Sequence, residues 1–176
     1  MIFTETKLDG AYIIESEKFI DERGFFARTW DIHEFIKNGI NSTFVQCSVS
    51  FNNKKGTLRG MHYQIYPYEE SKLIRCTKGK IFDVIVDLRK NSKTFKKWIG
   101  IELSQDNHKM IYVPEGFAHG FQTLEDNSEV FYQISKEYNS KSARGIRWDS
   151  PKISISWPLK VSVISQKDKN LPLFID

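Results

Sequence analysis

A cation and an imidazole lie three residues apart in residues 56–64, which read Gly-Thr-Leu-Arg-Gly-Met-His-Tyr-Gln. They are Arg59 and His62, and in a regular strand they would face opposite ways, because side chains alternate with period two. Gly60 stands between them, and a glycine inside a strand often marks a bulge, which would turn both side chains toward one site. A cation for an anion and an imidazole for a proton predict chemistry on a phosphorylated substrate.

His62 is the candidate base, since histidine is the side chain whose ordinary pKa lies near neutral pH. A single histidine in a strand is better explained as a hydrogen-bonded core residue, so the assignment of His62 as a base depends on its neighbours. Lys72 alternates with Ile74 and Cys76, and a lysine on an apolar face is unusual unless it is paired or functional. Tyr132 lies in an apolar strand pattern, where it is either a core tyrosine or a hydroxyl that points into a cavity.

Two further residues are candidates for the same site. His119 lies in Gly-Phe-Ala-His-Gly-Phe, between glycines that let the backbone come close to another group. Asp168 would orient an imidazole if the C-terminal segment folds back. A histidine base, a lysine for an oxyanion and a tyrosine acid suit proton abstraction next to a ketone, with inversion if base and acid lie on opposite sides of the carbon. Arg23 and Arg59 would bind a diphosphate, because guanidinium matches phosphate oxygens.

The elements that must position these residues are mostly strands. Eight strands are predicted, separated by turn signals, at 43–52, 57–64, 70–77, 80–89, 97–104, 109–113, 118–124 and 129–135. Residues 11–30 predict a strand, a turn at 21–24 and a second strand. One short helix is predicted to begin after Asp31, with Glu34 in capping-box spacing and Gly39 at its end. Short strands at roughly ten-residue intervals predict an all-β sandwich or barrel, with the less regular last forty residues packed over it.

Composition limits the classes of protein. A length of 176 residues predicts a single domain, 1–176, and 27% charged and 40% hydrophobic residues are typical of a soluble globular protein. The net charge of +4 is spread along the chain rather than clustered, which disfavours nucleic-acid binding. Cys47 and Cys76 show no disulfide-rich or C-x-x-C pattern, and the polar N-terminus shows no signal peptide or spanning segment. We therefore expect a cytoplasmic protein that does not enter a membrane.

Several segments resemble the dTDP-4-dehydrorhamnose 3,5-epimerase family, in order from about residue 8 to residue 172. They are Asp21-Glu-Arg-Gly-Phe-Phe, Thr57-Leu-Arg-Gly-Met-His-Tyr-Gln, Gly79-Lys-Ile-Phe-Asp-Val-Ile-Val-Asp-Leu-Arg, Val113-Pro-Glu-Gly-Phe-Ala-His-Gly-Phe, Ile146-Arg-Trp-Asp, Ile155-Ser-Trp-Pro and Ser165-Gln-Lys-Asp. The resemblance implies a cupin-type jelly roll, a homodimer that exchanges N-terminal strands, and no metal or organic cofactor. It implies an enzyme that acts between a 4,6-dehydratase and a 4-reductase in making a deoxysugar for polysaccharide.

The resemblance also implies a role for each site residue. His62 is similar to the family's base, Asp168 to its partner, Tyr132 to the acid on the other face and Lys72 to the residue that steadies the enolate. The remaining matches are the pocket residues His119 and Tyr138, the diphosphate clamp of Arg59 with Arg23 from the partner subunit, and the aromatics Phe19 and Phe26 beside the nucleotide base.

The sequence departs from the family pattern where the nucleotide base is expected. The family commonly reads Gln-Asp-Asn where this chain has Gln46-Cys47-Ser48, and it usually has an acid where this chain has Arg28. A carboxylate suits the N3 donor of thymine, whereas a donor such as arginine suits the N3 acceptor of cytosine. Two carriers therefore stay open, dTDP and CDP, and Arg28 is equally explained by solvent or phosphate contact.

Three other functions are considered for this sequence. A metal-dependent cupin typically has a His-x-His pair, but Tyr63 and Gln64 follow His62. A sugar-nucleotide binding protein without activity would be expected to lack His62 or Tyr132, and both are present. The main alternative is an epimerase of an NDP-linked 4-keto-6-deoxy hexose or heptose that inverts C3 only, because such an enzyme would keep the same base and acid.

Overall fold

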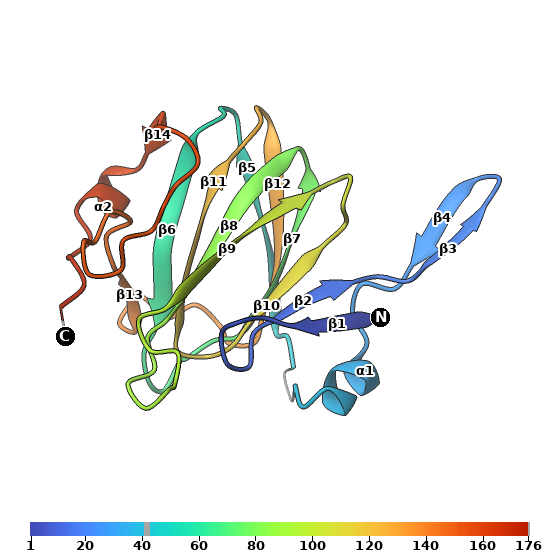
Figure 1. Ribbon diagram of the computed structural model, residues 1–176, viewed down its shortest axis with the longest axis horizontal. Helices are drawn as coiled ribbons and strands as arrows, with labels where there is room; N and C mark the ends of the chain where they lie inside the picture. The colour runs from blue at the N-terminus through green and yellow to red at the C-terminus, as the bar shows by residue number, and fades with distance from the viewer. Residues whose placement is uncertain (41–42, 176) are drawn as a thin grey trace.

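In the computed structural model, which describes residues 1–40 and 43–175, two β-sheets pack face to face and a hairpin projects from them (Figure 1). The first sheet has the order β1 (Ile2–Glu5), β2 (Tyr12–Glu15), β10 (Met110–Val113), β7 (Lys72–Lys78), β12 (Ser128–Ile134) and β5 (Gln46–Asn52). The second has the order β13 (Ala143–Gly145), β6 (Thr57–Gln64), β11 (Phe117–Thr123), β8 (Lys80–Asp87) and β9 (Trp98–Ser104), and β14 (Val163–Ile164) pairs with β6. The other elements are β3 (Lys18–Asp21), β4 (Gly24–Ala27), α1 (Ile32–Lys37) and α2 (Gln166–Lys169).

The eight strands predicted between residues 43 and 135 all form, as β5 to β12. The prediction of an all-β sandwich with one short N-terminal helix is confirmed. Helix α2 was not predicted, and the single strand predicted before the turn at 21–24 forms as two strands, β2 and β3, in different sheets. Three further short strands, β1, β13 and β14, were also not predicted. Their side chains are mostly exposed or half-buried, so their sequences carry no apolar alternation.

The main core lies between the two sheets. Ile74 of the first sheet and Ile85 and Phe121 of the second belong to one buried cluster. A second cluster, around Phe35 of α1, covers the outer face of the first sheet. A third, around Ile153, lies under the C-terminal tail, residues 146–175, as predicted for this segment. Burial on both faces makes the two sheets a rigid frame for any site between them.

Helix α1 begins where the sequence predicts it. The carboxylate of Asp31 accepts from the backbone N–H of His33 and Glu34, which caps the first turn. Only half of the capping box forms, because the Glu34 side chain instead contacts the N-terminal ammonium of Met1 at 2.7 Å. Gly39 follows the helix with a φ of +77°, a conformation that favours glycine, so the predicted end is also confirmed.

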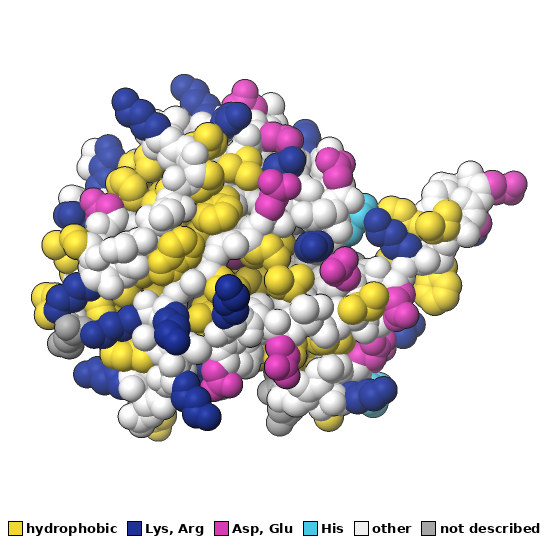
Figure 2. All heavy atoms as spheres, in the orientation of Figure 1, with side chains coloured by type: hydrophobic (Ala, Val, Ile, Leu, Met, Phe, Trp, Pro, Cys, Tyr) yellow, Lys and Arg dark blue, Asp and Glu magenta, His cyan; other side chains and the backbone are white. Residues whose placement is uncertain are grey.

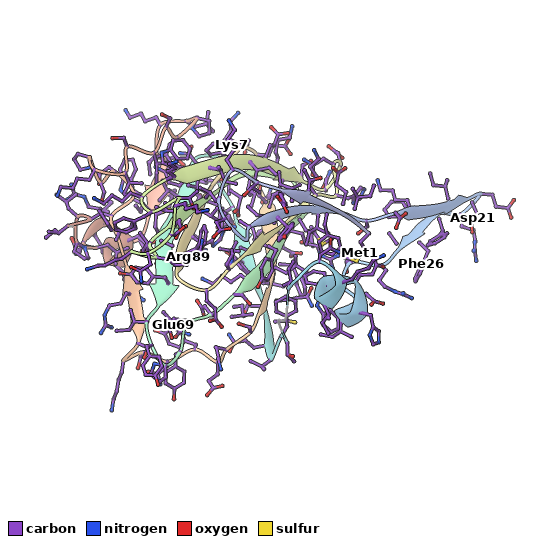
Figure 3. The ribbon with its side chains drawn as sticks, turned by 60° about the horizontal axis from the view of Figure 1, so that its bottom comes forward. Met1, Lys7, Asp21, Phe26, Glu69 and Arg89 are labelled. Atoms are coloured by element: carbon purple, nitrogen blue, oxygen red, sulfur yellow. The ribbon has the colours of Figure 1, made fainter. Side chains whose placement is uncertain are left out.

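The hairpin of β3 and β4 projects away from the sandwich as an arm, and its apolar side chains are exposed (Figures 1 and 2). The prediction of a turn at residues 21–24 is confirmed, since β3 ends at Asp21 and β4 begins at Gly24. Figure 3 shows Asp21 at the far end of the arm and Phe26 along it, well apart from Glu69 and Arg89 on the body. Phe25 still packs on His108 of the body, with ring centroids 5.0 Å apart, whereas Phe19 and Ile20 are exposed.

Candidate active site

A cavity of about 390 Å³ lies between the sheets and is called the central cavity below. Most of the residues predicted to form a site line it: Gln46, Ser48, Arg59, His62, Lys72, His119, Tyr132, Tyr138 and Asp168. Strands β5, β7 and β12 of the first sheet and β6 and β11 of the second carry most of them, and Asp168 comes from α2. The sandwich thus gathers side chains that lie more than a hundred residues apart in the sequence.

A bulge at Gly60 brings Arg59 and His62 to the same cavity. Along β11, His119 pairs with His62 and Phe121 pairs with Arg59, so β6 carries one more residue than β11 over this interval. Gly60 has a φ of +136°, and a Cβ on it would lie 2.6 Å from Cα of Gly120. The prediction that glycine allows this turn is therefore confirmed, because a side chain would collide with the facing backbone.

His62 forms a pair with Asp168 from the C-terminal tail. The Nε2 atom of His62 lies 2.7 Å from Oδ1 of Asp168, and the other carboxylate oxygen accepts from the backbone N–H of Gly60 at 3.3 Å. The tail reaches this point because β14 runs parallel to β6 and Ser165 caps α2. Burial works to raise the pKa of Asp168, but the hydrogen bonds from His62 and the backbone outweigh it and hold that pKa below its ordinary value.

His119 forms a second pair with Asp83 of β8. Its Nε2 atom lies 2.8 Å from Oδ2 of Asp83, and both side chains are buried. The other oxygen of Asp83 is buried and has no hydrogen-bond partner among the described residues. Burial raises the pKa of Asp83, although His119 acts in the opposite direction. Sequence reasoning missed Asp83, but an acid within the apolar run Ile-Phe-Asp-Val-Ile-Val was a usable signal.

Tyr132 and Lys72 enter the cavity from the sheet that faces His62. Tyr132 lies on β12 and its ring packs edge-to-face on His119, with ring centroids 6.0 Å apart. Burial, with the charge of Asp83 nearby, raises the pKa of Tyr132 far above its ordinary value, so the phenol keeps its proton. Lys72 at the start of β7 pairs with Glu70, a cavity residue that sequence reasoning did not assign. The base candidate and the acid candidate thus stand on opposite walls.

Two cations of the cavity lack a carboxylate partner among the described residues. Arg59 donates from Nε to the side-chain oxygen of Asn52 at 2.7 Å, and Lys167 on α2 lines the cavity beside Asp168. Sequence reasoning missed Lys167, although it lies within the quoted segment Ser165-Gln-Lys-Asp. Two such cations in the lining of one cavity suit a bound anion such as a diphosphate.

Other lining residues were also missed by sequence reasoning: Ser50, Gly120, Phe121, Ile134 and Ser165. Ser50 carried a signal, because it continues the alternation of Gln46 and Ser48 along β5, so all three face the cavity. Phe121 and Ile134 gave none, since apolar residues in strands are usually core.

Four predicted site residues lie outside the central cavity of this chain. Phe19 and Phe26 are on the arm, with 71% and 70% of their surface exposed. Arg23 at its tip pairs with Asp21, its own neighbour, and its side chain is 84% exposed. Arg28 pairs with Asp31 at 3.1 Å and is also exposed. Within one chain, the structure therefore does not bring these four residues to the central cavity.

Among residues 1–40 and 43–175, no group of three His, Cys, Asp or Glu side chains is placed to hold a metal ion. In that same part of the chain, no helix has the length and apolar character needed to span a membrane.

The chain is similar to known proteins over nearly its full length. The family model described as dTDP-4-dehydrorhamnose 3,5-epimerase matches residues 5–176. The dTDP-4-dehydrorhamnose 3,5-epimerase of Methanothermobacter thermautotrophicus is 46% identical over 171 residues, which cover 96% of this chain and 91% of that protein.

Solved structures agree in fold. That of the Bacillus anthracis dTDP-4-dehydrorhamnose 3,5-epimerase, with TDP and PPi bound, has a TM-score of 0.95 at 41% identity and covers 98% of this chain and 99% of its own. That of the Legionella pneumophila dTDP-6-deoxy-D-glucose-3,5-epimerase, in complex with dTDP-4-keto-L-rhamnose, has a TM-score of 0.91 at 37% identity and covers 98% and 92%. With a matching family model, close relatives and the same cupin fold, this chain belongs to the dTDP-4-dehydrorhamnose 3,5-epimerase family and is an epimerase.

Proposed function

We propose that this epimerase inverts C3 and C5 of a dTDP-linked 4-keto-6-deoxy sugar without a cofactor. The observation that carries the proposal is the placement of His62 and Tyr132 on opposite walls of one cavity, β6 of one sheet and β12 of the other. A sugar carbon held between them would lose a proton to one wall and gain a proton from the other, which inverts it.

The first step is proton abstraction by His62. Asp168 holds Nε2, which leaves Nδ1 as the ring nitrogen to take the proton from the carbon next to the C4 ketone. The low pKa of Asp168 keeps its carboxylate ionised, and this charge stabilises the imidazolium that forms. The electron pair of the broken C–H bond moves toward the ketone and produces an enolate.

The second step returns a proton from Tyr132. While the enolate exists, the ammonium of Lys72 stabilises the charge on its oxygen. The phenol of Tyr132, whose pKa is raised by burial, then protonates the carbon from the other side. Exchange with water removes the proton from His62 and restores that of Tyr132. The product would therefore carry solvent hydrogen at each inverted carbon.

The proposal includes a homodimer that completes each cavity. The arm exposes Phe19, Ile20 and Phe26, and exposed apolar groups in a row are typical of an interaction surface (Figure 2). We propose that the arm of each subunit lies on its partner and brings Arg23 to the diphosphate beside Arg59, with Phe19 and Phe26 beside the nucleotide base. His119, Gln46, Ser48 and Tyr138 then contact the sugar and nucleotide from the subunit's own walls.

The dimer is tested by charging the arm. Phe19→Asp with Phe26→Asp is expected to give monomers in sedimentation experiments and to remove most epimerase activity, while the circular dichroism of the sandwich stays unchanged. A matched control is Ile36→Asp, on the exposed side of α1, which is expected to leave both unchanged. Fully active monomers of the arm variant would contradict the proposal.

The substrate is tested by proton NMR in deuterium oxide, with the 4-keto-6-deoxyglucose derivatives of dTDP and CDP offered separately. We expect deuterium at both C3 and C5 of the dTDP sugar. Exchange at C3 alone would instead show the C3-only epimerase. Faster reaction of the CDP sugar would favour the alternative based on Arg28, and no exchange in either would contradict the proposed function.

We also propose that the enzyme acts in the cytoplasm. Cys47 and Cys76 are both free thiols, as is usual in a reducing compartment. Fractionation of cells that express the native gene would test this.

A further inference from the structure

Glu70 contributes a negative charge to a cavity built to stabilise a negative intermediate. Its Oε1 atom lies 2.8 Å from Nζ of Lys72, and the side chains of Glu70 and Lys72 are only 11% and 9% exposed. Both line the central cavity. A buried carboxylate next to a developing enolate has an electrostatic cost, so its presence requires a reason.

A fixed network holds Glu70 from the other side. The side-chain nitrogen of Gln64 donates to Oε2 of Glu70 at 2.9 Å and lies 3.0 Å from the carbonyl oxygen of Tyr68 and 3.2 Å from that of Glu137. Its oxygen accepts from the backbone N–H of Asn139 at 2.7 Å. Gln64 is buried and thus ties two loops together, one of which carries Tyr138. One oxygen of Glu70 is anchored in this way, so the other is presented to Lys72.

The three cationic lysine and arginine side chains of the cavity differ in their partners. Arg59 and Lys167 have no carboxylate partner in the part of the chain that the structure describes, and Lys72 has Glu70. A lysine ammonium is a mobile point charge on a long stem, and a diphosphate in the same cavity would attract it. Pairing with Glu70 opposes that movement and leaves two N–H groups of Lys72 for the substrate.

We propose that Glu70 is a positioning residue, which holds Lys72 where the enolate oxygen forms and keeps it away from the diphosphate. The proposal rests on the proposed function, because it assigns the enolate to Lys72. Glu70 acts through Lys72, to which its carboxylate gives a fixed hydrogen-bond acceptor. Catalysis depends on such groups being in place before the charge develops.

The test compares Glu70→Ala with Glu70→Gln. We expect Glu70→Ala to lower kcat about 30-fold with KM changed less than about 3-fold, since a misplaced group costs rate rather than ground-state binding. Glu70→Gln should stay within about 3-fold of the wild-type kcat, because its amide oxygen still accepts from Lys72. The new amide nitrogen replaces Oε2 and faces the side-chain nitrogen of Gln64, which keeps the carbonyls of Tyr68 and Glu137 for its two N–H groups. Thermal unfolding of Glu70→Gln must therefore match that of the wild type before the kcat values are compared.

A double-mutant cycle separates this role from a structural one. If Glu70 acts through Lys72, then Lys72→Ala and Lys72→Ala with Glu70→Ala have equal kcat. Additive losses would overturn the proposal, as would a wild-type kcat in Glu70→Ala or a Glu70→Gln variant as slow as Glu70→Ala. Should Glu70→Ala fail to fold, Glu70→Asp keeps the charge but shortens the reach, and an unchanged kcat there would overturn the proposal equally.

Turnover of the wild-type enzyme separates a failure of the proposed function from a failure of the role given to Glu70. Absence of exchange and epimerisation with the wild type would contradict the proposed function. Normal wild-type turnover combined with normal turnover of Glu70→Ala would contradict only the role of Glu70.

Discussion

Two regions of the central cavity hold the same pair of residue types and differ in access. His62 and Asp168 lie 2.7 Å apart where β6 meets the C-terminal tail, and His119 and Asp83 lie 2.8 Å apart between β11 and β8. The side chain of His62 is 42% exposed, whereas that of His119 is 6% exposed. The imidazole of His62 is open to the cavity, whereas that of His119 is largely covered and its ring packs on Tyr132.

The carboxylates differ in the same sense. Asp168 receives hydrogen bonds at both oxygens, which lowers its pKa. Asp83 has one oxygen without a partner among the residues that the structure describes, and burial raises its pKa. Distance alone therefore does not identify a catalytic pair. In the proposed mechanism, access to the cavity and hydrogen bonds at both carboxylate oxygens favour His62 with Asp168 over His119 with Asp83 as the proton-transfer pair.

Replacing each histidine gives the largest expected contrast. His62→Asn should lower kcat about 10³-fold, because the base is lost, and His119→Asn should lower it only about 10-fold. Steady-state turnover of the dTDP sugar measures both, and circular dichroism verifies folding. A larger loss for His119→Asn than for His62→Asn would reverse the assignment of the base.

Tyr132→Phe sharpens the comparison, because it should remove the acid and leave the base. We expect epimerised product to form about 10²-fold more slowly. Deuterium exchange that returns the starting sugar should decline much less, since His62 still removes the proton and can return it to the same face. NMR of the recovered sugar separates the two rates, and parallel loss of both would contradict separate roles.

The carboxylate partners should show a smaller contrast. Asp168→Asn is expected to lower kcat about 30-fold, because it removes the charge that stabilises the imidazolium, and Asp83→Asn less than about 5-fold. Turnover at saturating substrate checks this. Equal losses would mean that both pairs take part in proton transfer.

The smallest expected effect is on stability, and it has opposite signs in the two pairs. The pKa of Asp168 is lower in the folded protein than in the unfolded chain. Asp168 therefore adds to the free energy of unfolding above its unfolded pKa, and this stabilisation is lost as the pH falls through its folded pKa. The pKa of Asp83 is higher in the folded protein than in the unfolded chain. Asp83 therefore adds to the free energy of unfolding below its unfolded pKa, and this stabilisation is lost as the pH rises through its folded pKa.

Urea unfolding between pH 3 and pH 7 measures this difference. The free energy of unfolding of wild type minus Asp168→Asn should increase with pH, and that of wild type minus Asp83→Asn should decrease. A change in the same direction for both would show that burial does not separate the two carboxylates.

The sequence predicted most of this site because strands repeat with period two and glycines mark irregular points. Alternation placed Lys72, and Gly60 correctly indicated the bulge between Arg59 and His62. Asp168 was proposed from the sequence only on the condition that the C-terminal segment folds back, because no local pattern shows that a segment about a hundred residues away reaches β6.

What the sequence could not show are contacts that depend on two distant segments at once. Glu70 looks like a solvent-exposed loop acid until Gln64 and Lys72 are both in place. The pairing of Asp83 with His119 likewise exists only because β8 and β11 are neighbours in the sheet. The arm is a further example, because the local sequence pattern predicts a hairpin but not whether that hairpin packs on its own chain or on another chain.

The bulge at Gly60 also has a consequence for substrate length. Because Arg59 and His62 belong to one short stretch of β6, the spacing between the anion contact and the base is built into the backbone. A substrate must match that spacing with the number of bonds between its phosphates and its reacting carbon. Sugars with a different linkage to phosphate would be held, but their acidic C–H would lie beyond the reach of the imidazole.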